Sequence, residues 1–322
     1  MKIAVVGATG LVGRKIVELL IKTCSCPQDI VLYASKKSAG KELCIQGEKF
    51  IIKELNKRNI QKVDYALFCA GGKVSLKYAK YFIKKGAIVI DNSSAYRRHK
   101  KVPLIVPEIN FNQVGQAKLI ANPNCSSIGA SLPLFALMKT YTIKRVVVST
   151  YQAVSGAGQR GIDDYINKTT NKFNYQIAGN LIPQIDYALK NGYTFEEDKM
   201  SFELKKILQN RSIKICATCV RVPVVNCHCE SLNIELDRVP NLKTIKGLLQ
   251  NMEGVVLYDD LKDGKEPMPL VVDGKQEIFV GRLRKDTSNK YAINMFICFD
   301  NILKGASLNA VQILQKLIKI KK

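Results

Sequence analysis

The sequence predicts an α/β protein in which a Rossmann-like dinucleotide-binding domain is joined to an α+β domain with a mixed open sheet. Three observations lead to this prediction. Strand-like and helix-like runs alternate through residues 1–125, a glycine-rich turn follows the first strand-like run, and strand-like runs predominate after residue 126. We place the domains at 1–125 and 126–303, and expect a helix at about 304–322 to pack back onto the first domain.

The composition is typical of a globular protein. Of 322 residues, 47% are hydrophobic and 24% are charged, and the length suffices for two domains. No apolar run is long enough to span a membrane, and Gly7, Gly10 and Gly13 interrupt the N-terminal apolar stretch, unlike in a signal peptide. Ten cysteines, several in strand-like runs, suit a reducing compartment. We expect a cytoplasmic protein without a membrane partner.

The net charge of +23 raises the question of nucleic-acid binding. The lysines are spread along the whole chain, the sequence has no Trp, and no basic-aromatic repeat or DNA-binding motif is present. A charge excess of this kind bears on solubility and non-specific association. We therefore expect no specific nucleic-acid partner.

The first strand-like run, residues 2–6, leads into Gly7-Ala8-Thr9-Gly10-Leu11-Val12-Gly13. A helix follows, with an apolar stripe that includes Ile16 and Leu20. Glycines in such a turn let the backbone approach a pyrophosphate, which the helix N-terminus then binds. The alternative is a glycine-rich turn without a ligand. We assign cofactor contacts to Gly7, Thr9, Gly10, Leu11 and Val12.

The second strand, residues 30–34, is followed by Ser35-Lys36-Lys37-Ser38. A site for NAD usually places Asp or Glu there to bind the ribose hydroxyl. Two cations and two hydroxyls suit a 2′-phosphate instead, so we predict NADP, bound by Ser35, Lys37 and Ser38. The alternative is one more lysine-rich loop in a lysine-rich protein.

Further buried strands are expected at 63–69, 87–90 and 119–121, with a helix at 73–85. After the last of these strands comes Asn122-Pro123-Asn124-Cys125-Ser126-Ser127, and an apolar, helix-like run covers 128–138, where Pro133 predicts a kink. Cys125 thus lies at or near a helix N-terminus, where the helix dipole favours a nucleophilic thiolate. A buried structural cysteine is the alternative.

The second half is rich in strands, and an open mixed sheet with helices on one face needs a partner surface. We therefore expect a homodimer that forms through this sheet. Residues 161–200 are expected to hold a short helix and then a long connection. The expected strands are 145–150, 215–225, 232–236, 254–257, 277–283 and 291–299, and the expected helices are 161–168, 202–208, 242–252 and one from about 306.

Two clusters have both a functional and an ordinary interpretation. Glu203 and Lys206 share one face of a predicted helix, and alone they suggest a surface ion pair. Four cysteines and a histidine raise the question of zinc. Because positions three apart in a strand face opposite sides, Cys216 and Cys219 cannot reach one ion, and we predict no metal. This second cluster consists of Cys216, Cys219, Cys227, His228 and Cys229.

Taken together, the motifs resemble the aspartate-semialdehyde dehydrogenase family along nearly the full chain. Seven motifs occur in the family's order: G-A-T-G-L-V-G at 7–13, S-K-K-S-A-G-K at 35–41, N-P-N-C-S-S at 122–127, Q-A-V-S-G-A-G at 152–158, R-V-P-V at 221–224 with His228, G-R-L-R-K-D at 281–286 and N-A-V-Q at 309–312. The resemblance implies NADPH-dependent reduction of aspartyl 4-phosphate to aspartate 4-semialdehyde and phosphate, on the route to lysine, threonine and methionine.

The resemblance also implies roles for individual residues. Cys125 matches the nucleophile, Gln152 the residue that orients the acyl group, and His228 the acid/base, whose ordinary pKa lies near working pH. Arg221 matches the binder of the substrate carboxylate. The remaining implied contacts are Asn124 to the substrate, Glu203 to its amino group, Lys206 and Arg97 to the phosphate, and Ser155, Gly156 and Gln312 to the cofactor.

Two other functions remain open at this point. N-acetyl-glutamyl-phosphate reductase is similar in fold and cysteine chemistry, but resembles N-P-G-C-Y-P around its nucleophile, which is not found here. A non-catalytic, basic binding protein on the same fold is the alternative from another class. Such a protein would be expected to lose Cys125 or His228, and both are present.

Overall fold

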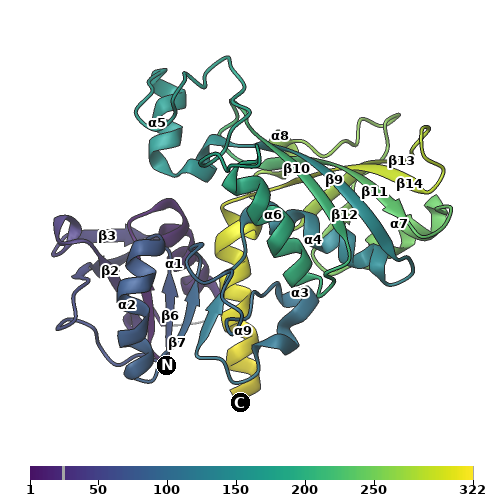
Figure 1. Ribbon diagram of the computed structural model, residues 1–322. Helices are drawn as coiled ribbons and strands as arrows, with labels where there is room; N and C mark the ends of the chain where they lie inside the picture. The colour runs from purple at the N-terminus through teal and green to yellow at the C-terminus, as the bar shows by residue number, and fades with distance from the viewer. Residues whose placement is uncertain (24–25, 322) are drawn as a thin grey trace. The chain divides into compact units, whose positions relative to one another are not determined.

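The computed structural model describes residues 1–23 and 26–321. The chain divides into two compact units. Unit 1 consists of Met1–Pro123 and Ala306–Lys322, and unit 2 of Asn124–Gly305. Figure 1 shows the elements of each unit.

Unit 1 contains a six-stranded parallel sheet in the order β5-β2-β1-β6-β7-β8. The central strands are buried along their whole length, because helices cover both faces of the sheet. This confirms the predicted dinucleotide-binding type of sheet. The strands are β1 (Ile3–Val6), β2 (Ile30–Ala34), β5 (Lys53–Glu54), β6 (Tyr65–Phe68), β7 (Ile88–Asp91) and β8 (Leu119–Ala121).

The main helices of unit 1 are α1 (Leu11–Thr23), α2 (Gly72–Lys84) and α9 (Leu308–Lys321). The β1–β2 and β6–β7 crossovers run in opposite directions along the sheet, so right-handed connections place α1 and α2 on opposite faces. Ala79 and Phe82 of α2 pack with Phe68 on one face. Helix α9 packs against α1 and β7 on the other (Figure 1).

The turn between β1 and α1 requires glycine at two positions. Gly7 has φ +91°, and a Cβ there would lie 2.8 Å from the backbone nitrogen of Ala70. A Cβ at Gly13 would lie 2.2 Å from the carbonyl oxygen of Gly7. The helix N-terminus therefore packs tightly onto the carboxyl end of β1, as a pyrophosphate-binding turn needs.

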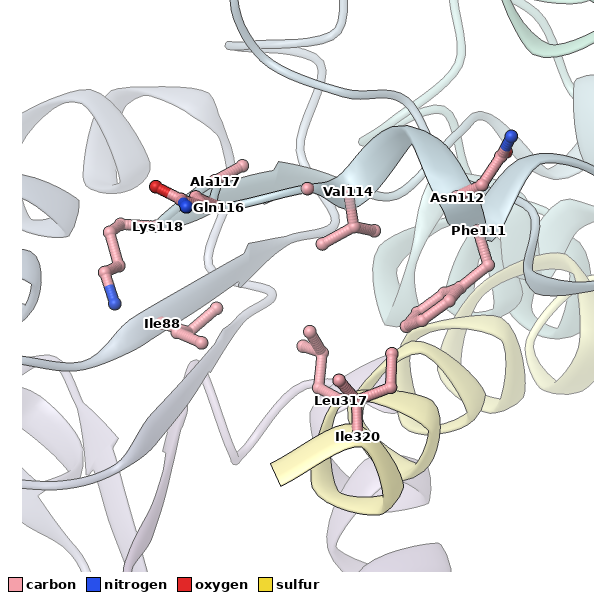
Figure 2. Close-up of a pocket in the computed structure, with 10 residues that line it drawn as sticks. Ile88, Phe111, Asn112, Val114, Gln116, Ala117, Lys118, Leu317 and Ile320 are labelled. Atoms are coloured by element: carbon pink, nitrogen blue, oxygen red, sulfur yellow. The ribbon is translucent and has the colours of Figure 1, made fainter. Parts of the chain in front are cut away.

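The sequence analysis did not predict the hairpin of β3 (Glu42–Ile45) and β4 (Glu48–Ile51), in which one side chain of each strand, Leu43 and Phe50, is buried. Short helices complete unit 1: η1 (Pro27–Asp29), η2 (Lys36–Ser38), α3 (Pro107–Asn110) and η3 (Phe111–Val114). A pocket of about 500 Å³ lies between η3, α9 and the start of β7, and Figure 2 shows Ile88, Val114 and Leu317 turned toward it. It adjoins the amino-terminal edge of the sheet, opposite the edge at which ligands bind in such folds.

Unit 2 is built on a six-stranded sheet in the order β10-β9-β11-β14-β13-β12. The β9–β10 and β12–β13 pairs are parallel and the other pairs are antiparallel, which confirms the predicted mixed sheet. The strands are β9 (Ile143–Gln152), β10 (Lys214–Arg221), β11 (His228–Leu236), β12 (Val255–Leu257), β13 (Ile278–Lys285) and β14 (Ala292–Phe299).

Helix α4 (Cys125–Met138) lies on β9, β11 and β14, between α6 (Phe195–Ile207) and α7 (Leu242–Gln250) (Figure 1). Its side chains are buried on almost every side, which explains its apolar sequence. Pro133 lies inside α4, and the helix continues past it to Met138. Shorter helices are η4 (Val154–Ala157), α5 (Gln159–Asn167), α8 (Pro269–Val272) and η5 (Leu303–Ser307).

Three predicted boundaries, at 202, 225 and 232, were wrong. Helix α6 starts at Phe195 rather than 202, because Thr194 and Glu197 form a capping box at its N-terminus. The strand predicted for 215–225 ends at Arg221, and the chain then turns so that His228 begins the next strand. These differences bring polar side chains onto the face of the sheet that α4 covers, among them Glu196 and His228.

Candidate active site

Three of the predicted site residues lie side by side across adjacent strands of unit 2. Gln152 on β9 pairs with Arg221 on β10. On the other side of β9, the antiparallel strand β11 pairs Cys229 with Tyr151. His228, one residue before Cys229, therefore lies beside Gln152. All three side chains are buried. The sheet register therefore forms a row of a guanidinium, an amide and an imidazole, which we call the catalytic row.

Cys125 is the first residue of α4, so the expected helix N-terminus is confirmed. Asn124 caps the helix: its side chain accepts a hydrogen bond of 3.0 Å from the backbone N–H of Ser126. The Cys125 Sγ lies 3.9 Å from Oδ1 of Asn124, and the residue is partly exposed. Helix N–H groups and the nearby positive charge of Arg221 both favour a thiolate at this position.

Gln152 connects the nucleophile's helix to a buried acid. Its Nε2 donates hydrogen bonds to Oγ of Ser126 (2.6 Å) and to Oε1 of Glu196 (3.1 Å). The same oxygen of Glu196 accepts a hydrogen bond of 3.0 Å from Nδ2 of Asn124. Both amide hydrogens of Gln152 are thus used, which fixes the orientation of its side chain.

Glu196 is an ionised carboxylate inside the protein. Its oxygen lies 2.6 Å from Nζ of Lys199, which also pairs with Asp186 at 3.0 Å. Burial alone would raise the pKa of Glu196, but Lys199, Gln152 and Arg221 together hold that pKa at about 2. The site therefore contains a fixed negative charge next to the catalytic row.

His228 is held in one tautomer. The backbone N–H of Ala153 donates a hydrogen bond of 3.0 Å to its Nδ1, so a neutral ring carries its proton on Nε2. Burial and the charge of Arg221 lower the pKa of His228 to about 3. The expectation that this histidine titrates near working pH was therefore wrong. It rested on the ordinary pKa of an exposed imidazole.

The η4 loop passes close over the catalytic row. A Cβ at Gly156 would lie 2.9 Å from a terminal nitrogen of Arg221 and 3.0 Å from Cε1 of His228, so only glycine fits without displacing them. The neighbouring Ser155 is buried, and its Oγ accepts a hydrogen bond of 3.0 Å from Nδ2 of Asn301. Arg221 donates to the carbonyl oxygen of Ala153 at 2.6 Å.

Glu203 and Lys206 both lie on α6, and the substrate contacts that the resemblance implies for them stay predictions. Glu203 is buried, and its carboxylate accepts a hydrogen bond of 2.6 Å from the backbone N–H of Asn124, which steadies the N-terminus of α4. Lys206 is partly buried, and this burial lowers the pKa of its ammonium group.

Sequence reasoning missed Glu196 and Lys199. The signal that could have found them was Thr194-x-x-Glu197, which starts the helix early enough to place 196, 199 and 203 on one face.

The predicted cofactor residues of unit 1 lie at the carboxyl edge of its sheet. Gly7, Thr9 and Gly10 form the turn into α1, and Leu11 and Val12 begin that helix. Ser35, Lys37 and Ser38 lie in and beside η2, directly after β2, with Ser35 and Lys37 exposed. A dinucleotide with an additional phosphate fits these residues. The glycines of the turn leave the backbone N–H groups accessible to a pyrophosphate, and the η2 loop presents ammonium and hydroxyl groups. Gln312 lies on α9.

Arg97 is anchored within unit 1. Its Nε donates to the carbonyl oxygen of Asn122 at 2.9 Å, and a terminal nitrogen donates to that of Asn92 at 2.8 Å. The guanidinium is buried beside the carboxyl end of β7. Its position is therefore fixed by backbone carbonyls.

The cysteines considered for zinc point to different sides of the unit 2 sheet. Cys219 and His228 face α4, whereas Cys227 and Cys229 pack with Cys298 and Val272 on the other face. In residues 1–23 and 26–321, no group of three or more His, Cys, Asp or Glu side chains is arranged to hold a metal ion.

Comparison with known proteins agrees with this arrangement. Residues 2–117 match the semialdehyde dehydrogenase NAD binding domain, and residues 134–304 match the semialdehyde dehydrogenase dimerisation domain. The aspartate-semialdehyde dehydrogenase of Aquifex aeolicus is 44% identical over 99% of this chain and 98% of its own length. The chain belongs to the aspartate-semialdehyde dehydrogenase family.

Other members of the aspartate-semialdehyde dehydrogenase family match as completely. The Bacillus subtilis enzyme is 41% identical over 99% of this chain and 98% of its own. A crystal structure of aspartate semialdehyde dehydrogenase II from Vibrio cholerae, complexed with ASA, has a TM-score of 0.93 and 36% identity, and covers 99% of this chain and 98% of that one. Among the described residues of this family member, no helix is both long and apolar enough to cross a membrane.

Proposed function

We propose that this protein catalyses the reversible, NADPH-dependent reduction of L-aspartyl 4-phosphate to L-aspartate 4-semialdehyde and phosphate, a step in lysine, threonine and methionine biosynthesis. The observation that carries the proposal is the position of Cys125. It opens α4, is capped by Asn124, and is followed by Ser126, which is hydrogen-bonded to Gln152 of the catalytic row. A cysteine in this position suits covalent attack on an acyl carbon.

In this mechanism the Cys125 thiolate attacks the acyl carbon of aspartyl phosphate. The bond from that carbon to the phosphate oxygen breaks, phosphate leaves and a thioester remains on Cys125. Lys206 and Arg97 bind the departing phosphate as cations. When bound, NADPH supplies a hydride to the thioester carbon. The resulting alkoxide expels the Cys125 thiolate and yields the aldehyde.

The proton balance of these steps decides what His228 does. Because the alkoxide collapses directly to aldehyde and thiolate, no proton has to be added at the carbonyl oxygen. The oxygen needs only a hydrogen-bond donor while it carries negative charge. Neutral His228, with its proton on Nε2, is such a donor. We therefore assign His228 to oxyanion stabilisation, together with backbone N–H groups at the start of α4.

The two charged groups of the substrate's aspartyl part are bound by protein side chains of the opposite charge. Arg221 binds the α-carboxylate. Glu196, the ionised acid next to Gln152, binds the α-amino group, and Glu203 supports it by fixing the backbone of Asn124. Gln152 and Asn124 orient the part of the substrate that lies between its α-carboxylate and α-amino groups and the reacting carbon.

The cofactor is proposed to be NADP. Its phosphates are bound by the turn at 7–13 and by Ser35, Lys37 and Ser38, and Ser155, Gly156 and Gln312 complete the site. The dimerisation-domain match supports a homodimer formed through the sheet face away from α4. On that face the exposed Tyr151 lies next to the partly exposed Phe296, with their rings tilted at 37° to each other. The nine described cysteines are all free thiols, which supports a cytoplasmic location.

The test is an assay of the purified protein in the oxidative direction. L-aspartate 4-semialdehyde, phosphate and NADP should give NADPH, and omission of phosphate should abolish turnover. N-acetylglutamate semialdehyde in the same assay tests the related reductase. Activity only with that second aldehyde, or with neither, contradicts the proposal. RNA retention that falls with salt, in a protein with no turnover, would favour the non-catalytic alternative.

A further inference from the structure

A buried asparagine between β14 and η5 connects two segments that border the catalytic row. Asn301 is 2% exposed and lies shortly after β14 ends at Phe299. The turn that carries it is held by Asp300, whose Oδ1 accepts hydrogen bonds of 2.9 Å from the backbone N–H groups of Ile302 and Leu303. Asn301 therefore belongs to a well-anchored part of unit 2.

A backbone group fixes the orientation of the Asn301 amide. The backbone N–H of Cys227 can only donate, and its nitrogen lies 2.9 Å from Oδ1 of Asn301. Nδ2 is therefore the atom that faces Ser155, and it donates to the hydroxyl oxygen of Ser155 at 3.0 Å. That hydroxyl is also 3.4 Å from Oδ1, but Oδ1 already accepts the shorter bond. One amide thus joins the η4 loop to the residue before His228.

The backbone conformation of Cys227 explains why this contact matters. Its φ is +71°, in the left-handed region that a residue with a Cβ adopts only at an energetic cost. This conformation turns the chain into β11, which begins at His228. The hydrogen bond from Cys227 to Asn301 stabilises the turn, and the turn determines where the His228 ring lies.

The η4 loop, at the other end of the link, also contacts the catalytic row. The backbone N–H of Ala153 donates to Nδ1 of His228, and the carbonyl oxygen of Ala153 accepts from Arg221 at 2.6 Å. Gly156 lies so close to His228 that a Cβ there would be 3.0 Å from Cε1 of the ring. A shift of this loop relative to the turn before β11 would therefore disturb the position of the imidazole.

We propose that Asn301 is a positioning residue for the reaction, which locks the η4 loop to the turn before His228. This assignment rests on the proposed function, in which His228 stabilises the oxyanion and Ser155 and Gly156 contact NADP. Asn301 does not act on the reacting atoms itself. It acts on His228 through the backbone of Cys227, and on the cofactor through the hydroxyl of Ser155.

The experiment measures kcat and KM for NADP in variants of the full-length enzyme, with L-aspartate 4-semialdehyde and phosphate as the other substrates. Asn301→Ala breaks both links. The kcat should fall about threefold to tenfold and KM for NADP should rise about threefold, as expected for the loss of neutral hydrogen bonds.

Two double-variant comparisons separate positioning from a simple loss of stability. In a His228→Ala background, Asn301→Ala should change kcat less than about twofold, because the group that it positions is gone. In a Ser155→Ala background, it should change KM for NADP less than about twofold for the same reason. A side chain that only stabilised the fold would have the same effect in every background.

Asn110→Ala is the matched control. Asn110 is also 2% exposed, and it lies on α3 of unit 1. Its amide accepts a hydrogen bond from the backbone N–H of Val106 and donates one to the carbonyl oxygen of Leu104, both at 2.9 Å. The control should lower the melting temperature as Asn301→Ala does, while changing kcat and KM for NADP less than about twofold.

The proposal is overturned if Asn301→Ala keeps the wild-type kcat and KM for NADP, or if Asn110→Ala reproduces its losses. It is also overturned if those losses persist undiminished in the His228→Ala and Ser155→Ala backgrounds. If Asn301→Ala does not fold, Asn301→Asp decides. Its carboxylate still accepts from the N–H of Cys227 but has no amide hydrogen for Ser155, so KM for NADP should rise about threefold, and an unchanged KM overturns the proposal. A wild-type enzyme without phosphate-dependent turnover would instead contradict the proposed function itself.

Discussion

The backbone N–H of Ala153 donates a hydrogen bond to Nδ1 of His228, at 3.0 Å. This contact blocks the nitrogen that a proton would need to reach to make the ring cationic. Complete burial and the positive charge of Arg221 also disfavour the protonated ring. Together they lower the pKa of His228 to about 3. A histidine held in this manner is a fixed hydrogen-bond donor from Nε2, in contrast to a side chain that gains and loses protons in each turnover.

The donor role predicts different effects for two substitutions at this position. His228→Gln places an amide N–H near the location of Nε2 and should retain part of the activity. His228→Ala removes the donor and should lower kcat about 100- to 1,000-fold. Steady-state kcat for both variants checks this. Equal losses, or a wild-type acid limb near pH 6.5 that disappears in both variants, would instead support proton transfer by His228.

Neutral burial of His228 also predicts an acid-sensitive fold. The unfolded chain binds a proton at this ring below about pH 6.5, whereas the folded chain does not until about pH 3, so stability decreases as pH falls through that range. From this group alone the free energy of unfolding should be about 1.4 kcal/mol lower at pH 5.5 than at pH 8. Urea unfolding at both pH values measures the difference.

A matched control exists for this prediction. His228→Asn should reduce the pH dependence of the unfolding free energy. Leu232→Ala, which removes a buried side chain that does not titrate, should lower the unfolding free energy equally at both pH values. An unaltered difference in the His228 variant would mean that other groups account for the acid sensitivity.

Local sequence signals predicted the parts of the site that depend on neighbours in the chain. Cys125 was placed at a helix N-terminus because a strand-like run precedes it and an apolar, helix-like run follows it. The side-by-side arrangement of Gln152 and His228 could not be predicted in that way, because it depends on the β9–β11 register between residues 76 apart. The lowered pKa of His228 has the same origin, since its causes are burial and a charge on another strand. Glu196 was missed although its signal, the capping box at 194–197, is local.

Substitution of Cys125 tests the covalent step. Cys125→Ser replaces a thiol by a hydroxyl that stays protonated, so kcat should fall by at least about 1,000-fold while NADPH binding is retained. Cys44→Ser, at an exposed position of unit 1, is the control and should be active. Steady-state turnover checks the loss of activity, and a fluorescence titration with NADPH checks that the cofactor still binds. Turnover near the wild-type value in Cys125→Ser would rule out the thioester mechanism.

Choice of cofactor depends on Lys37 in the loop after β2. Lys37→Ala should raise KM for NADP about fivefold, a modest effect because the ammonium is exposed, and should leave KM for NAD unchanged. Lys22→Ala is the control, because it removes an ammonium group at the far end of α1, away from the cofactor turn. A wild-type enzyme that prefers NAD, or an equal effect of both variants, contradicts the 2′-phosphate site.

Glu196 is the strongest candidate for selecting an amino-bearing substrate. Glu196→Gln keeps an acceptor for Asn124 but removes the negative charge, and Lys199 keeps Asp186 as its partner at 3.0 Å. The fold should therefore tolerate the change. Loss of one charge-assisted hydrogen bond should lower kcat/KM for L-aspartate 4-semialdehyde about 10- to 100-fold, mainly through KM.

Succinate semialdehyde, which lacks the amino group, makes this prediction specific. The wild-type enzyme should discriminate strongly against it, and Glu196→Gln should lose most of that discrimination because only the amino-bearing substrate gained from the carboxylate. Asp198→Asn removes a negative charge from the first turn of the same helix and should preserve the preference. If Glu196→Gln discriminates as well as the wild type, another group binds the amino group, and the carboxylate serves only to hold Gln152 and Asn124.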